Sequence, residues 1–125
     1  MPMSVRAVAP QAPGTALFEE FESLLPYFNN LSEEVRSIFI KSIALLVEHL
    51  EISGDGLAEK TISELQPTLL RLRERYDQYR RQNIIIACAI FIVMAHIQSH
   101  YLTDPDANLV HNLTKLYIDR SRAAG

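Results

Sequence analysis

The sequence predicts an all-α fold, a single-domain bundle of about five helices with a long, centrally buried fourth helix. Apolar residues recur at spacings of three and four along most of the chain, which is the period of amphipathic helices. The stretch from Ile84 to Ala95 has no polar side chain except the thiol of Cys88, so it has no side that could face water. We therefore expect other helices to surround it. At 125 residues, the chain has the usual length of one domain.

The two ends of the chain are predicted to lie outside the bundle. Residues 1–14 contain Pro, Ala, Gln and Gly without a periodic apolar side, which is typical of a disordered tail. The helical domain is expected to span residues 15–122, and residues 123–125 form a second short tail. Thr15 can cap a first helix, which we expect Pro26 to end because proline disrupts a helix interior.

Ser32 marks the start of the second helix, because this serine N-cap precedes two acidic residues that suit the positive end of the helix dipole. Gly54 can end this helix in the left-handed conformation, and Asp55 can cap a third. We end the third helix at Gln66, since the residue before Pro67 disfavours helical geometry. The apolar stripe of the second helix consists of Leu31, Val35, Ile38, Phe39, Ile43, Leu46 and Leu50.

The fourth helix is predicted to run without a break from Pro67 to about His100, as the central rod of the bundle. The sequence Thr103-Asp104-Pro105 then supplies a capping residue followed by proline at the first helical position. It starts a fifth helix that ends near Arg120. The apolar side of this fifth helix carries Leu109, Leu113, Leu116 and Tyr117.

The predicted long helix contains a heptad pattern, because nine of its residues follow each other at alternating steps of three and four. Such a seam can pair with a second helix along its length, and Asn83 stands where a buried asparagine commonly fixes the register of a helix dimer. The pattern is therefore compatible with a homodimer. Alternatively, it is the ordinary core spacing of a long bundle helix. The seam residues are Leu69, Leu72, Tyr76, Tyr79, Asn83, Ile86, Ile90, Val93 and Ile97.

An arginine-rich cluster surrounds two tyrosines in the polar half of the same helix, and residues 71–81 carry a net positive charge. Arginine and tyrosine side chains suit contact with an acidic protein partner. The alternative is a solvated helix side supported by ion pairs at a spacing of four. Nucleic acid is not the expected partner, since the chain has a net charge of −3 and no recognition motif. The residues predicted to bind a partner are Arg73, Tyr76, Tyr79, Arg80 and Asn83.

No metal, cofactor or catalytic site is predicted. His96 and His100 share one side of a helix, and Asp104 and His111 are possible neighbours, but a zinc site needs further ligands that the pattern does not supply. We expect these histidines to be hydrogen-bonded at the end of a buried helix. No serine, cysteine or lysine stands in a recognisable arrangement with a base, so an enzyme is not expected.

These observations favour a noncatalytic interaction module, a small adaptor, chaperone or regulatory subunit that is homodimeric through helical packing. We expect it in the cytoplasm, because the N-terminal segment lacks the apolar stretch of an export signal, and the apolar run of the fourth helix is too short to span a membrane. The alternative is a receptor for a small ligand or cofactor, with a pocket inside the bundle lined by Cys88, Phe91 and Met94.

Overall fold

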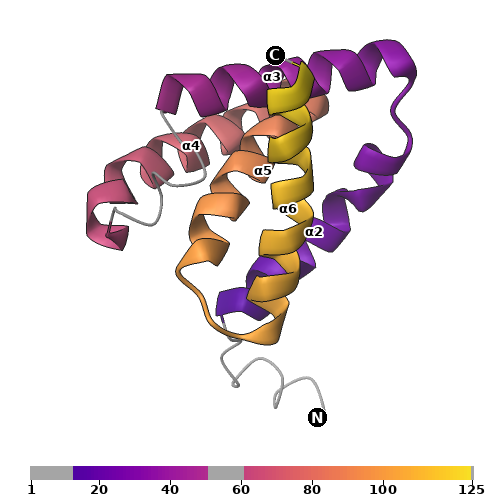
Figure 1. The fold of residues 1–125 in the computed structure, drawn as a ribbon. Coiled ribbons are helices and arrows are strands. Elements are labelled where there is room, and N and C mark those ends of the chain that lie inside the picture. The colour runs from indigo at the N-terminus through magenta and orange to yellow at the C-terminus, as the bar shows by residue number, and fades with distance from the viewer. Residues whose placement is uncertain (1–12, 51–60, 125) are drawn as a thin grey trace.

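A computed structural model describes residues 13–50 and 61–124 of the chain (Figure 1). These residues confirm the predicted all-α class and the number of about five helices. No helix within these ranges is long and apolar enough to cross a membrane. The helices are α2 Pro13–Asn29, α3 Glu33–Leu50, α4 Ile62–Gln82, α5 Ile84–His100 and α6 Pro105–Ala124.

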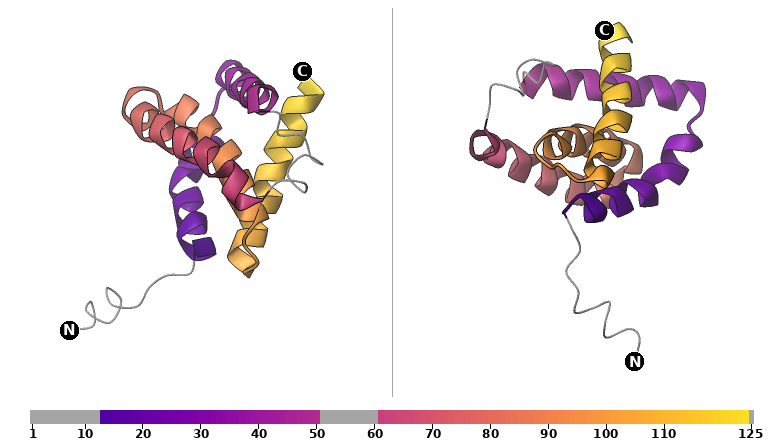
Figure 2. Two further views of the ribbon diagram at one scale, coloured as in Figure 1. Left: turned by 90° about the vertical axis from the view of Figure 1, so that its left-hand side faces the viewer. Right: turned by 60° about the horizontal axis from the view of Figure 1, so that its bottom comes forward.

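Helix α5 occupies the centre of the bundle and packs against α2, α3, α4 and α6. All its residues from Ala87 to Ile97 are buried. Figure 2 shows the other helices around it, with α3 crossing α6 at a steep angle. The predicted central burial of the apolar run is confirmed, because a helix that meets neighbours on every side needs no polar side.

The predicted unbroken helix from Pro67 to His100 is wrong, since Asn83 separates α4 from α5. Its backbone is extended, with φ −152° and ψ 97°. The backbone N–H of Asn83 donates to the carbonyl of Tyr79 at 2.7 Å, which caps the end of α4. Its side-chain oxygen accepts from the N–H groups of Ile85 and Ile86 at 3.2 and 3.4 Å, which caps the start of α5. A short polar side chain that satisfies the backbone in this way competes with continued helix.

The chain folds back at Asn83, so α4 packs on α5 as a helical hairpin. Tyr76 of α4 contacts Phe91 of α5, with ring centroids 5.7 Å apart. Apolar seam residues on both sides of the break are buried in this one chain, among them Leu69, Leu72 and Ile90. The heptad spacing therefore reflects packing within a hairpin and does not form a continuous seam for a second chain.

The predicted end of the first helix at Pro26 is also wrong, because α2 continues through it to Asn29. Proline has no N–H to donate to the carbonyl of Glu22. Glu22 and Pro26 are both exposed, so this carbonyl can bind water. The turn after Pro26 is held by Phe28, which is buried, and by the side-chain amide of Asn30, which donates to the carbonyl of Pro26 at 2.6 Å. The helix begins at Pro13, two residues before the predicted Thr15.

The predicted starts of two helices are confirmed. The Ser32 hydroxyl accepts from the N–H of Val35 at 3.3 Å, and the Asp104 carboxylate accepts from the N–H of Ala107 at 3.0 Å. The predicted boundary at Gln66 and Pro67 is wrong, because α4 already begins at Ile62 behind the cap Thr61 and runs through the proline. The predicted turn at Gly54 and Asp55 and the predicted tail before Pro13 lie outside the described residues.

Helix α6 buries a different side from the one its apolar pattern predicts. The buried positions of α6 are Ala107, Val110, Thr114, Ile118 and Ser121. Small side chains let α6 approach the rest of the bundle closely, and the two buried hydroxyls donate within their own turns, to the carbonyls of His111 and Ile118. Leu109 and Leu116 are consequently exposed, at 43% and 65%.

Candidate binding site

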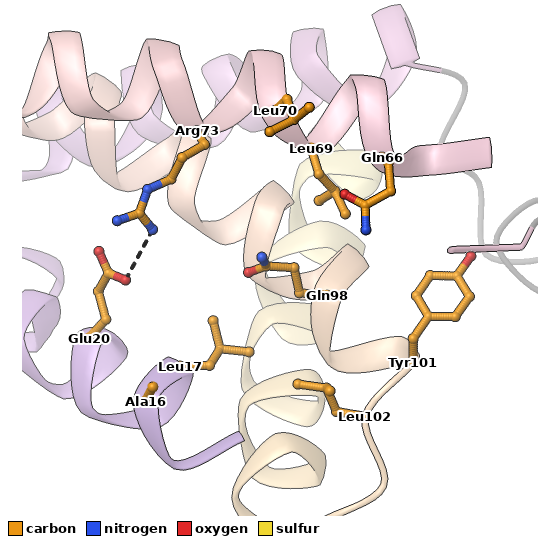
Figure 3. Close-up of a pocket in the computed structure, with 10 residues that line it drawn as sticks. All are labelled: Ala16, Leu17, Glu20, Gln66, Leu69, Leu70, Arg73, Gln98, Tyr101 and Leu102. Carbon is orange, nitrogen blue, oxygen red and sulfur yellow. Dashed lines mark hydrogen bonds and ion pairs between the residues drawn. The ribbon is translucent and has the colours of Figure 1, made fainter. Parts of the chain in front are cut away.

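The described surface has a groove between α2 and α4, called here the α2–α4 groove (Figure 3). Its volume is about 660 Å³, and the C-terminal half of α5 forms its floor. It exists because α2 and α4 pack against α5 without packing extensively against each other. The groove is lined by Ala16, Leu17, Glu20, Gln66, Leu69, Leu70, Arg73, Gln98, Tyr101 and Leu102.

The walls of the groove are mainly apolar. Leu17 of α2 and Leu69 of α4 are buried at its base, whereas Leu70 at the rim is 62% exposed. At one end, an Arg73 Nη1 lies 3.5 Å from a Glu20 carboxylate oxygen, so this ion pair links the two walls. Arg73 also lies 3.5 Å from a carboxylate oxygen of Asp77, one turn further along α4. Both contacts are long and exposed, so they add little to stability.

Hydrogen-bonding groups also line the groove. Figure 3 shows the amide of Gln98 near the middle of the floor. The amide of Gln66 and the ring of Tyr101 lie toward the end of the groove that is away from Glu20. Burial raises the pKa of Tyr101, and the nearby carboxylate of Glu64 raises it further. The site therefore combines apolar walls with polar groups of known position.

The structure brings only one of the five residues predicted to bind a partner, Arg73, into this groove. Tyr76 is 1% exposed and belongs to the core. Its hydroxyl accepts a hydrogen bond from Arg80 at 2.9 Å, and burial raises its pKa. Tyr79 is half-buried, and Asn83 caps two helices. A partner-binding role for this set stays a prediction, with Arg73, Arg80 and Asn83 as its exposed members.

Sequence reasoning missed most residues of the groove, among them Glu20, Leu70 and Gln98. They come from three helices, and no spacing along the chain joins them. The exposed Leu70 could have been recognised as a departure from the core pattern of α4, because it lies beside the seam position Leu69. The complete groove becomes visible only once the helices are placed in space.

A second cluster joins three histidines at the turn between α5 and α6, as the sequence spacing suggested. The rings of His96 and His111 are stacked, with centroids 4.6 Å apart and planes 14° apart. The ring of His100 lies 5.7 Å from that of His111. Among the described residues, no three His, Cys, Asp or Glu side chains are arranged to hold a metal ion.

Two hydroxyl groups connect the stacked pair to the backbone. The Thr114 hydroxyl lies 3.3 Å from His96 Nδ1 and donates to the His111 carbonyl at 3.1 Å. The Ser99 hydroxyl lies 3.1 Å from His111 Nδ1 and 3.2 Å from the His96 carbonyl oxygen. Each ring is thus within hydrogen-bonding distance of one hydroxyl. The predicted hydrogen bonding at the end of the buried helix is found for His96, whereas His100 is exposed and contacts Tyr101 and His111 through its ring.

Comparison of the chain with models of protein families, with curated proteins and with solved structures finds no match.

The residues predicted to line a pocket inside the bundle, Cys88, Phe91 and Met94, are core residues that are each no more than 1% exposed. The α2–α4 groove, at the surface of the bundle, is lined by none of them.

Proposed function

We propose that the protein is a noncatalytic interaction module that forms a homodimer through the outer side of α6. The observation that carries this proposal is the exposure of Leu109 and Leu116 on the outer side of α6; with Leu113 between them they are here called the α6 leucine stripe. Leu109 and Leu116 are 43% and 65% exposed, and Leu113 between them is half-buried. Val110 and Ile118 face the core, and Leu113 packs partly against it, so Leu109 and Leu116 are left for another surface.

A second copy of the chain is the occupant that the stripe suits best. Its leucines follow each other at steps of four and three, which is the spacing of a helix–helix seam. In a two-fold dimer the same patch meets itself, and we place the two-fold axis across α6, so that the two α6 helices run antiparallel.

The charge of α6 also suits this antiparallel arrangement. Asp106 lies in its first turn, whereas Lys115, Arg120 and Arg122 are exposed in its second half beside Asp119. Antiparallel pairing places the acidic end of one helix beside the basic end of its partner. The helix dipoles are then also favourably opposed. Because three leucines from each copy make a small apolar core, we expect a weak dimer with a dissociation constant of about micromolar.

A dimer formed through α6 leaves the outer side of helix α4 uncovered, which supports the adaptor role. Helix α4 packs extensively on α5 alone. Arg71, Arg75 and Arg81 are exposed, and none of them forms an ion pair with another described residue. Two copies would present two such basic surfaces, and two linked binding surfaces strengthen attachment to a partner that offers acidic groups repeatedly.

The dimer is tested by sedimentation equilibrium over a range of protein concentrations, with native mass spectrometry of the same samples. We expect a monomer that converts to a dimer as the concentration rises. Leu116→Glu should raise the dissociation constant by about tenfold or more, since it places a carboxylate in an apolar contact.

Leu70→Glu is the matched control, because it makes the same change at a leucine of similar exposure on α4. It should leave the dissociation constant unchanged. Circular dichroism checks that both variants keep their helix content. A chain that stays monomeric at the highest concentration contradicts the proposal, as does a dimer that is unaffected by Leu116→Glu.

A further inference from the structure

We infer that the α2–α4 groove binds a small, uncharged molecule that is largely apolar and carries hydrogen-bonding groups. This site is separate from the α6 leucine stripe and lies on other helices. The inference rests on the shape of the groove, on its unpartnered amides and on the balance of its charges.

The shape of the groove sets the size of its ligand. Along α4 the lining runs from Gln66 to Arg73, which is about 10 Å at the rise of an α-helix. On α2 it covers a single turn, from Ala16 to Glu20. The Glu20–Arg73 ion pair crosses one end. A volume of about 660 Å³ lies in the range of small-molecule sites, whereas a docked helix of several turns would extend past the ion pair.

Two amides in the groove are available to a ligand. Neither Gln66 nor Gln98 uses its side chain in a hydrogen bond with any described residue, and both point toward the hollow in Figure 3. Gln98 is half-buried on the floor, between the apolar side chains of Leu17 and Leu69. Each amide supplies a donor and an acceptor, so a ligand with an N–H, a hydroxyl or a carbonyl can be oriented there.

The charges of the groove favour an uncharged ligand. Its lining contains one carboxylate, Glu20, and one guanidinium, Arg73, and these two groups neutralise each other. Asp77 also approaches Arg73, so an anion bound to this arginine would meet two carboxylates. A cation at Glu20 would have to displace Arg73, which already neutralises that carboxylate. An ion therefore loses its hydration without gaining a net opposite charge.

The test uses two fluorescent probes with the same aromatic skeleton. N-phenyl-1-naphthylamine is uncharged and carries one N–H, and 1-anilinonaphthalene-8-sulfonate differs from it by one sulfonate. Each is titrated with the full chain at a concentration below the dissociation constant of the dimer. We expect saturable binding of one uncharged probe per chain, and an affinity for the sulfonate that is lower by about tenfold or more.

Leu70→Glu should lower the affinity for the uncharged probe by about tenfold, because it adds a third carboxylate beside the groove. Leu116→Glu is the control and should bind this probe as the wild type does. Leu116→Glu tests the dimer and is the control for the groove, whereas Leu70→Glu tests the groove and is the control for the dimer. Failure of one proposal is therefore distinguishable from failure of the other.

The inference is overturned if the uncharged probe shows no saturable binding, or if both probes bind equally. It is also overturned if Leu70→Glu and Leu116→Glu affect binding to the same extent. Leu70 and Leu116 are both more than half exposed, so we expect both variants to fold. A Gln98→Leu variant that still binds the uncharged probe at full affinity would contradict the role of the floor amide.

Discussion

The ring of His96 lies nearly parallel to the ring of His111, with the two centroids 4.6 Å apart. His96 is 6% exposed, and its pKa is lowered to about 4, mainly by burial. His111, His100 and Arg122 contribute to this lowering, and Asp119 opposes it. Burial, His100 and Lys115 lower the pKa of His111, although contact with the His96 backbone raises it. The stack is therefore built from neutral rings.

The stability of the fold is expected to depend on pH through this stack. Unfolding exposes His96, whose pKa returns to about 6.5, so the unfolded chain binds more protons at mildly acidic pH. The stabilisation from the neutral ring is complete above about pH 6.5 and is lost as the pH falls toward 4. His96 alone can contribute up to about 3 kcal/mol to this loss. Urea denaturation at several pH values between these limits measures it.

His96→Asn separates this effect from the titration of other groups. Its amide can still donate to the Thr114 hydroxyl, but it does not titrate in this range. We expect the variant to be less stable at neutral pH and to lose most of the dependence between pH 6.5 and 4. His100→Asn, at an exposed position of the same cluster, should retain most of it. Equal pH profiles for His96→Asn and the wild type would contradict this account.

Asn83 is expected to stabilise the fold as a cap. Asn83→Ala removes the oxygen that accepts from Ile85 and Ile86 and should lower the free energy of unfolding by about 1 kcal/mol. Asn83→Asp should restore it, because a carboxylate accepts the same hydrogen bonds. Gln82→Ala, at the exposed neighbouring position, is the control and should have little effect. If the two alanine variants lose equal stability in urea denaturation, the cap is not the reason for the break.

The sequence was sufficient to predict the helical class, the burial of the central apolar run and the caps at Ser32 and Asp104. These features depend on local patterns. It did not predict the break at Asn83, because heptad spacing is the same for one long helix and for a hairpin whose halves pack together. The burial of Thr114 in place of Leu116 could not be foreseen either, since it depends on how closely α6 approaches its neighbours.

The α2–α4 groove was beyond sequence prediction for a similar reason. Arg73 was recognised as an exposed cation, but its partner Glu20 lies 53 residues away along the chain. The distance between α2 and α4 depends on how both helices pack on α5. No local pattern contains that information.

Tyr76 is expected to act through packing and not through its hydroxyl. Its ring contacts Phe91 and lies 5.6 and 5.8 Å from the guanidinium carbons of Arg73 and Arg80. Tyr76→Phe removes one hydrogen bond to the exposed Arg80, which water can replace, and should cost about 1 kcal/mol or less. Tyr76→Ala should lower the free energy of unfolding by about 3 to 5 kcal/mol. Tyr79→Ala, at a half-buried position, should cost less, and an equal loss in urea denaturation would argue against this difference in packing.

Cys88 is expected to be chemically inert in the folded chain. It is 1% exposed, and burial raises the pKa of its thiol to about 12, although Arg80 partly offsets this. At about pH 8 the folded chain then holds very little of the thiolate that attacks alkylating reagents. Iodoacetamide should modify the native protein at less than about one hundredth of its rate with the chain in guanidinium, which is the control.

The residual reaction of Cys88 should report the opening of the core. Labelling of an inaccessible thiol requires an unfolding event, so its rate should rise in proportion to the unfolded population when variants lower stability. Asn83→Ala, about 1 kcal/mol less stable, should label about fivefold faster than the wild type. Mass spectrometry of timed samples measures both rates. Rapid labelling of the wild type, or equal rates in the two chains, would mean that Cys88 is reached by a local opening that leaves the hairpin intact.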